Sequence, residues 1–225
     1  MPRGNLFVMT GASGVGKGTI RGRLLEYHRM YYSISMTTRP PRVGERHGVD
    51  YYFVSKAEFE SKIAQNGFLE WAQYVDDYYG TPREPVEQAL SKGQDVILEI
   101  EVQGALQVKQ AMPEAILVFI IPPSLSELRR RLLVRGTDSL NKIHKRLKRA
   151  EEEIRMADQF KYVLVNDQLD KAVSDFAAII QAERLLQPRM REALARALSK
   201  DPALESELDE LERKRLEAGE QGSSK

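Results

Sequence analysis

The sequence predicts an α/β protein in which a central parallel sheet carries helices on both faces. Apolar runs at 6–10, 96–98 and 116–121 are nearly continuous, as in strands that are buried on both faces. They alternate with segments of helical periodicity, which favours parallel strands joined by crossover helices. The segment 37–83 interrupts this alternation with short strand-like pieces and many aromatic residues. We therefore expect it to form a small inserted lobe.

The amino-terminal half begins with a buried strand that enters a glycine-rich turn, and a helix follows. Residues 37–50 are rich in Thr, Pro, Arg and Gly, which predicts an exposed loop. Ser55 and Glu58 have the spacing of a capping box and mark a helix start, whereas Gly93 marks a helix end. The predicted elements are strands at 6–10, 32–36, 51–54, 69–75 and 78–79, and helices at 16–30, from 55 onward and at 84–91.

The carboxyl-terminal half begins with a strand and ends with a packed helix. Pro122 and Pro123 terminate the apolar strand before them, and Ser124 caps the helix that follows. The predicted elements are strands at 96–101, 116–121 and 162–166, helices at 103–111, 124–135, about 143–156 and 169 to about 186, and a loop at 136–142.

The composition indicates a normal hydrophobic core and a balanced charge. The chain has 225 residues, 42% of them hydrophobic, with 34 Lys and Arg against 33 Asp and Glu. The absence of cysteine excludes disulfides and thiolate metal sites, and no apolar run reaches the roughly 18 residues of a membrane helix. Because the first residues also lack a signal-peptide pattern, we expect a cytoplasmic protein with no membrane partner. The balanced charge argues against a nucleic-acid partner.

A phosphate-binding loop is the strongest motif. It follows an apolar strand and precedes a helix, which is the context that such a loop requires. Its glycines let the backbone turn its N–H groups inward, the helix N-terminus adds positive potential, and Lys17 reaches the outer phosphates of a nucleotide. Gly18 stands where the general pattern has Ser or Thr, so the Thr19 hydroxyl is expected to serve Mg²⁺ directly or through water. The loop consists of Gly11, Ala12, Ser13, Gly14, Val15, Gly16, Lys17, Gly18 and Thr19.

Two carboxylates end the otherwise apolar strand at 96–101. Glu99 and Glu101 are two residues apart, so an extended strand points both to the same side. Carboxylates on a central strand are costly unless they are paired or lie at its carboxyl end, where ligands of such sheets bind. This favours contact with Mg²⁺ or with a second substrate. The alternative is a salt bridge to one of the many arginines.

The segment 129–149 is strongly basic, with nine Lys and Arg against one acid, Asp138. It fits a nucleic-acid patch, a solvated helix face, or a lid whose arginines clamp transferring phosphates. Interleaved aromatic residues are absent, and the loop upstream supplies a phosphate to clamp, which favours a lid that uses Arg131, Arg135 and Arg146. The other basic residues are expected at the surface: Arg129, Arg130, Lys142, Lys145, Lys148 and Arg149.

The inserted segment carries a further phosphate signal. Ser35 to Arg42 is a proline-stiffened loop whose two arginines, Arg39 and Arg42, can hold one phosphate from two sides. With this segment and the phosphate loop, the sequence closely resembles the guanylate kinase family over about residues 4–185. The matching stretches are 11–19, 35–42 with Gly44 and Glu45, 48–51, 68–72, 78–80, 98–104, 135–137 and 165–167.

The resemblance implies a three-layer P-loop NTPase fold with a central parallel sheet, an inserted GMP-binding lobe and a helical lid. It implies reversible transfer of the γ-phosphate of ATP to GMP in purine nucleotide metabolism, with Mg²⁺ as cofactor. The implied domain covers 4–186, with a core at 4–34, 84–135 and 157–186, the lobe at about 35–83 and the lid at about 136–156. Residues 187–225 are left as a charged helical or disordered tail.

The resemblance also assigns residues by position. Glu70 would select guanine, because its carboxylate accepts from N1–H and the exocyclic amine, whereas adenine presents an acceptor at N1. Glu101 replaces the usual Asp of the family and Thr81 the common Ser. The implied GMP contacts are Ser35, Arg39, Arg42, Tyr51, Glu70, Tyr79, Thr81 and Glu101. The implied ATP contacts are the loop 11–19, Arg131, Arg135 and Asn166. The implied catalytic residues are Lys17, Arg39, Arg135 and Arg146. Thr19 and Glu101 would serve the metal, directly or through water.

Three alternatives remain open from the sequence. They are another nucleoside monophosphate kinase, a phosphopeptide-binding module of this fold without catalysis, and a nucleic-acid-binding protein that uses the basic segment. The Glu70 region argues against the first, and the intact phosphate loop and arginines argue against the second.

The tail differs in composition from the rest of the chain. Residues 199–225 hold eight acidic and five basic residues, and Leu204, Leu208, Leu211 and Leu216 predict a thin amphipathic helix. A solvated tail is favoured over a helix that binds a partner or forms a dimer, and residues 219–225 are expected to be disordered. The sequence leaves monomer and homodimer open.

Overall fold

The computed structural model describes residues 3–134, 136, 139–199 and 206–214. The chain divides into one compact unit that ends at Glu183 and a second unit from Arg184 onward. Arg135, and Leu204 and Leu216 of the predicted tail helix, lie outside the described residues. No helix among the described residues is both long enough and apolar enough to cross a membrane.

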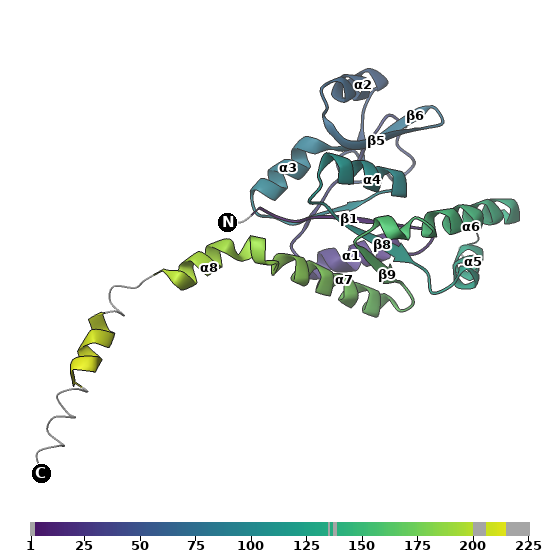
Figure 1. Cartoon of the computed structure of the whole chain (residues 1–225). Coiled ribbons are helices and arrows are strands. Elements are labelled where there is room, and N and C mark those ends of the chain that lie inside the picture. The colour runs from purple at the N-terminus through teal and green to yellow at the C-terminus, as the bar shows by residue number, and fades with distance from the viewer. Residues whose placement is uncertain (1–2, 135, 137–138, 200–205, 215–225) are drawn as a thin grey trace, which may run out of the picture. The chain divides into compact units, whose positions relative to one another are not determined.

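The main sheet has five parallel strands in the order β2-β7-β1-β8-β9 (Figure 1). The central strand β1 is buried along its whole length and pairs Val8 with Leu98 on one side and with Leu117 on the other. This arrangement confirms the predicted α/β fold with a parallel sheet. The strands are β1 (Leu6–Gly11), β2 (Tyr31–Tyr32), β7 (Val96–Glu99), β8 (Ile116–Ile121) and β9 (Tyr162–Val165).

Helices cover both faces of this sheet, which gives three layers. Because successive side chains of a strand point to opposite faces, Phe7 and Met9 join one core cluster while Leu6 and Val8 join the other. The first cluster packs α1 (Lys17–Tyr27), α5 (Leu125–Val134), α6 (Leu140–Ile154) and α7 (Leu169–Arg184), and the second packs α3 (Arg83–Ser91) and α4 (Val102–Ala111).

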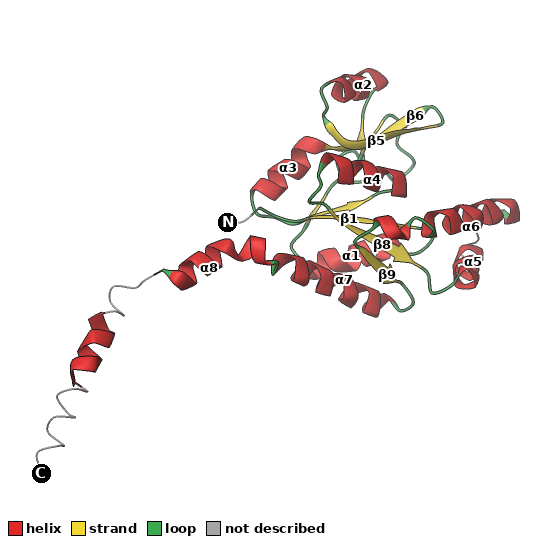
Figure 2. Cartoon of the chain, in the orientation of Figure 1, coloured by secondary structure: helices red, strands yellow, loops and turns green. Residues whose placement is uncertain are grey.

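Residues 36–82 contain a second, four-stranded sheet in the order β4-β3-β6-β5, seen apart from the main sheet in Figure 2. Its helix α2 (Lys56–Ala64) begins after Ser55, whose side chain accepts a hydrogen bond from the Glu58 N–H as the capping pattern predicts. Phe59 of α2 stacks on Phe68 and anchors a small core of its own. The strands are β3 (Met36–Thr37), β4 (Tyr52–Phe53), β5 (Phe68–Tyr74) and β6 (Asp77–Pro82).

Two sequence predictions about strands are wrong. The single strand at 32–36 is two strands in different sheets, since Tyr31–Tyr32 pairs with β7 and Met36–Thr37 pairs with β6. The strand at 96–101 ends at Glu99, and Glu101 is the N-cap residue of α4. In addition, α6 starts three residues earlier than predicted, because Ser139 caps it.

The remaining described elements are short. A 3₁₀ turn at Ala157–Gln159 precedes β9. In the second unit, a 3₁₀ turn at Gln187–Met190 leads into α8 (Arg191–Leu198), and residues 206–214 are helical. Leu194, Leu198, Leu208 and Leu211 are exposed, so the described part of the tail has no core of its own.

Candidate functional site

The phosphate loop lies at the carboxyl end of β1, where it turns into α1. Gly16, the N-cap residue of α1, has φ +97°, a conformation that side-chain-bearing residues rarely adopt. Nζ of Lys17 donates to the carbonyl oxygens of Gly11 (2.6 Å) and Ala12 (3.3 Å), so the lysine folds back over its own loop. Burial lowers the pKa of Lys17, and the nearby carboxylates of Glu99 and Glu153 oppose that shift.

Side chains from distant parts of the chain brace this loop. Nδ2 of Asn166, which follows β9, donates to the Val15 carbonyl at 2.7 Å. The Arg131 guanidinium on α5 donates to the Asn166 carbonyl at 2.9 Å and to Glu127 at 2.8 Å. Hydrogen bonds from Arg130 and Arg131 lower the pKa of Glu127 to about 2. The structure therefore gathers Arg131 and Asn166, both predicted ATP contacts, at the phosphate loop.

Helix α6 also contacts the phosphate loop. Nη2 of Arg146 donates to Oγ of Ser13 at 2.6 Å. Arg149 is exposed, as the sequence predicts, and it donates to Glu101 at 2.7 Å and to Glu153 at 2.9 Å, so it links α6 to the residue that precedes α4. The sequence-based assignment overlooked Glu153. A signal was present, since Arg146, Arg149 and Glu153 have the i, i+3, i+7 spacing of one helix face.

The two glutamates after the apolar strand do not act as a pair. Glu99 accepts from Arg21 at 2.8 Å, and Arg21 also donates to the Tyr32 hydroxyl at 2.7 Å. Glu101 instead belongs to the ion network of Arg149. The salt-bridge alternative thus describes both residues in this structure. Even so, both Glu99 carboxylate oxygens lie 3.9 Å from the place where a Cβ on Gly18 would stand, which puts Glu99 beside the phosphate loop.

A buried carboxylate lies in the inserted lobe, facing α4. Glu70 is 8% exposed, and Thr81 opposite it donates from Oγ1 to Glu70 Oε1 at 2.6 Å. A Cβ on Gly104 would stand 2.8 Å from Glu70 Oε2, so glycine leaves room for the carboxylate against the helix. Burial raises the pKa of Glu70, while the hydrogen bonds from Thr81 oppose that shift.

The other end of the lobe gathers cationic and phenolic groups. Nη2 of Arg39 donates to both carboxylate oxygens of Glu45 at 2.9 Å, and the Arg42 N–H donates to Glu45 at 2.7 Å. The Arg39 guanidinium lies 5.6 Å from the ring centre of Tyr51, whose ring meets that of Tyr79 edge to face. The sequence-based assignment gave Glu45 no role, although it lies six residues after Arg39.

The remaining predicted contacts are less enclosed. Ser35 is half-buried, and its backbone carbonyl accepts a hydrogen bond from the Tyr52 N–H at 2.9 Å. Arg42 and Thr19 are exposed. Arg135 lies outside the described residues.

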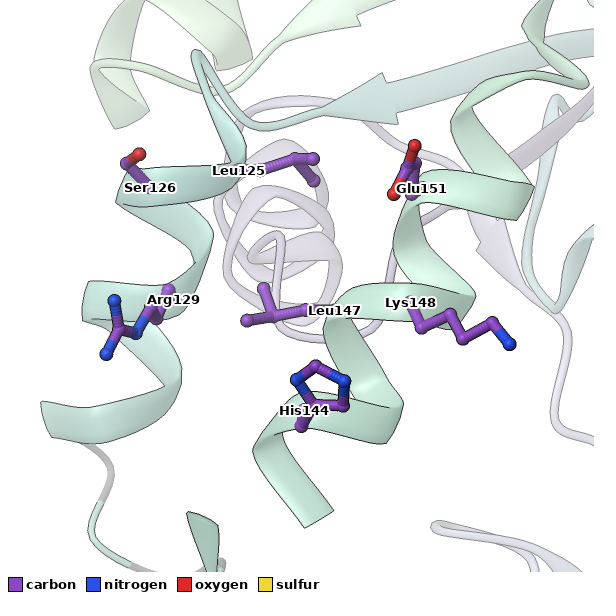
Figure 3. Close-up of a pocket in the computed structure, with 7 residues that line it drawn as sticks. All are labelled: Leu125, Ser126, Arg129, His144, Leu147, Lys148 and Glu151. Carbon is purple, nitrogen blue, oxygen red and sulfur yellow. The ribbon is translucent and has the colours of Figure 1, made fainter. Parts of the chain in front are cut away.

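A cavity of about 420 Å³ between α5 and α6 is separate from this site (Figure 3). Leu125, Arg129, His144, Leu147 and Lys148 are among the residues that line it, and none of them is a predicted substrate contact. His144, Leu147 and Lys148 share one face of α6, whereas Arg146, Arg149 and Glu153 share the opposite face, so the cavity opens away from the phosphate loop.

Comparison with known proteins gives one consistent result. The family model described as guanylate kinase matches residues 3–183. A guanylate kinase from Thermus thermophilus is 65% identical over 95% of this chain and 97% of its own length, and one from Deinococcus radiodurans is 62% identical over 82% and 78%. The crystal structure of guanylate kinase from Anaplasma phagocytophilum matches with a TM-score of 0.70 and 33% identity, over 89% of this chain and 98% of that one.

The site geometry and these similarities agree. Arg146 of α6 contacts the phosphate loop, and the second sheet carries a buried carboxylate and an arginine that lies beside a tyrosine ring. The chain belongs to the guanylate kinase family, and its reaction is the reversible transfer of the γ-phosphate of ATP to GMP, which gives ADP and GDP.

Proposed function

We propose that the residues assigned from the sequence divide between the two substrates. The loop 11–19 with Arg131, Arg135 and Asn166 binds ATP. The lobe binds GMP through its guanine end at Glu70 and Thr81 and its phosphate end at Arg39, with Glu101 between the lobe and the lid. The full GMP set is Ser35, Arg39, Arg42, Tyr51, Glu70, Tyr79, Thr81 and Glu101.

The buried pair of Glu70 and Thr81 is the observation that carries this proposal. A carboxylate that is 8% exposed needs partners that donate hydrogen bonds. Thr81 donates from its hydroxyl and from its backbone N–H, which leaves further acceptor positions on the two carboxylate oxygens. Guanine supplies two donors side by side, N1–H and the exocyclic amine. Adenine would set its N1 lone pair against the carboxylate, which costs several kcal/mol, on the order of the penalty for an unpaired buried group.

For the chemical step, we propose in-line attack by a phosphate oxygen of GMP on the γ-phosphorus of ATP, without a covalent intermediate or a protein base. Lys17, Arg39, Arg135 and Arg146 would neutralise the charge of the moving group, since positioning and charge stabilisation dominate phosphoryl transfer. In the structure, the loop carbonyls, Glu45 and Ser13 hold Lys17, Arg39 and Arg146. Substrate phosphates would replace these contacts as lobe and lid close and exclude water.

The residues fit a magnesium ion that is carried largely by the nucleotide. The described residues contain no cluster of three or more His, Asp or Glu side chains that could hold a metal, and Mg²⁺ usually takes few protein ligands beside phosphates and water. The Thr19 hydroxyl at the start of α1 and the Glu101 carboxylate are oxygen donors of the required kind. Bound Mg²⁺ would add positive charge at the transferring phosphates. We include cytoplasmic localisation, as predicted from the sequence, in this proposal.

An ATP-consumption assay with a panel of monophosphates tests the proposal. We expect rapid turnover with GMP, little with AMP or dTMP, and none when EDTA removes Mg²⁺. Higher turnover of AMP or dTMP would contradict the assignment of Glu70 and Thr81. The same distance between lobe and core in a substrate-free structure and a doubly liganded one would contradict the closure.

A further inference from the structure

Glu153 on α6 has no role in the binding of ATP, GMP or metal as proposed for this chain. Its side chain is 13% exposed. Oε1 accepts from Nε of Arg149 at 2.9 Å, whereas Oε2 is buried with no hydrogen-bond partner in the part of the chain that the structure describes. A buried acceptor without a partner carries an unrecovered desolvation cost, so its presence calls for a compensating role.

The position of Glu153 on α6 directs it to the phosphate loop. Arg146, Arg149 and Glu153 share one helix face, and Arg146 at one end of that face donates to Ser13 of the loop. At the other end, the charge of Glu153 acts on Lys17, Arg149 and Glu101. The same lysine feels Glu99 from β7, Glu101 from the start of α4 and Arg146 from α6.

A purely structural role does not explain this arrangement. Arg149 already has a partner in Glu101, at 2.7 Å, so it does not need a second carboxylate for neutralisation. Nor is Glu153 needed to hold Lys17 in its present position, where two loop carbonyls accept from the ammonium. The unpaired carboxylate oxygen, whose charge already acts on this lysine, becomes useful when the ammonium leaves those carbonyls for a phosphate.

We infer that Glu153 is a positioning residue for phosphoryl transfer. One carboxylate oxygen orients Arg149, and the other receives the Lys17 ammonium when it turns from its own loop toward the lid. The lysine of the phosphate loop and the arginines of α6 thereby reach the same phosphoryl group. The inference rests on the proposed role of Lys17.

The test compares Glu153→Gln, which keeps the size but removes the charge, with Glu153→Asp, which keeps the charge. We expect Glu153→Gln to lower kcat about tenfold or more, as expected when a charged group is displaced, with KM for ATP and for GMP changed less than threefold. Glu153→Asp should recover part of kcat. The thermal midpoint of Glu153→Gln should not fall, because a buried charge with an unpaired oxygen is removed. Glu151→Gln, on the same helix and paired with Arg155, is the matched control and should keep wild-type kinetics.

A double mutant separates the inference from the assignment on which it rests. If Glu153 acts through Lys17, adding Glu153→Gln to Lys17→Ala should cost little more than Lys17→Ala alone. Wild-type kcat in Glu153→Gln, or a loss of kcat that follows a loss of thermal stability and is not relieved in Glu153→Asp, would overturn the inference alone. A fully active Lys17→Ala variant would overturn the role of Lys17 and the inference with it.

Discussion

The two ends of the site are constructed differently. The phosphate loop is a contiguous run of backbone at the end of one strand, and side chains such as Asn166 and Arg146 brace it from outside. The lobe site consists of side chains carried by separate strands and loops, with Glu70 on β5, Thr81 on β6 and Arg39 on a loop. Backbone amides recognise the common charge of phosphates, whereas only placed side chains distinguish one base from another.

The difference implies that the two ends fail in different ways. Damage to the loop should reduce the rate with every acceptor, because the same γ-phosphate is transferred in each case. Damage to the lobe should act on GMP alone and leave the use of ATP intact.

Lys17→Ala gives the largest expected effect. Removal of the only side-chain cation within the loop should lower kcat about 10³-fold, as for removal of a main charge-stabilising group. The loss should be similar with GMP and dGMP, measured by coupled ADP release. Lys171→Ala, which loses only a surface pair with Asp175 on α7, is the control. If Lys17→Ala changed only KM for GMP and left kcat unchanged, the proposed difference between the phosphate loop and the lobe would be wrong.

Glu70→Gln tests the lobe. It keeps the shape but replaces an acceptor oxygen with an amide donor that opposes guanine N1–H, so kcat/KM for GMP should fall about 10²-fold. KM for ATP should stay within twofold, by steady-state kinetics with each substrate varied in turn. The exposed Glu60→Gln on α2 serves as control. An equal change in both KM values would show that the ends are not independent.

Gly104→Ala probes the space behind Glu70. The new Cβ would stand 2.8 Å from Glu70 Oε2 and push the carboxylate out of place, so KM for GMP should rise about tenfold, in line with the cost of small misplacements. Gly22→Ala on α1 is the matched control, since no atom lies within 4 Å of its Cβ position. It should leave kinetics unchanged and raise stability by about 0.5–1 kcal/mol through helix propensity. Wild-type affinity for GMP in Gly104→Ala would show that the lobe tolerates displacement.

The pH dependence gives the smallest effect near neutrality. Burial raises the pKa of Glu70, so this residue takes up its proton at a higher pH than an ordinary glutamate. Guanine needs the ionised form, and KM for GMP should therefore rise as pH falls through that pKa, approaching tenfold per unit. In Glu70→Gln this rise in KM should be absent. A change in KM that comes from protonation of the GMP phosphate should remain, because both proteins bind the same phosphate. If KM for GMP rises equally at low pH in the wild type and in Glu70→Gln, Glu70 is not the residue whose protonation causes the rise.

The sequence reveals the loop end more completely than the lobe end. The phosphate loop is recognisable because its residues are adjacent and its strand and helix flank it, and the structure places it where the pattern predicts. In the lobe, the sequence itself indicated a phosphate site at Arg39 and Arg42, whereas the guanine contacts Glu70 and Thr81 were assigned only through the resemblance to a family. The pairing of Thr81 with Glu70 depends on strand register, which a linear pattern does not specify.

The errors have physical causes. The rule that alternate residues share a face holds only while a strand continues, and the chain turns after Glu99 into the N-cap of α4, which separates Glu99 from Glu101. The run 32–36 is divided because Tyr31–Tyr32 completes the main sheet and Met36–Thr37 starts the lobe sheet. Local propensity does not record which sheet supplies the partner.

The sequence by itself determined the layered α/β architecture, the phosphate loop and the family, because apolar periodicity and contiguous backbone motifs are local properties. Only the tertiary structure decided which partners the arginines meet: Arg146 with Ser13, Arg149 with Glu101, and Arg39 with Glu45. These partners come from separate elements or loop turns, and the energy of a charge depends on its distance to its neighbours and on its burial. The chain must fold before either quantity is defined.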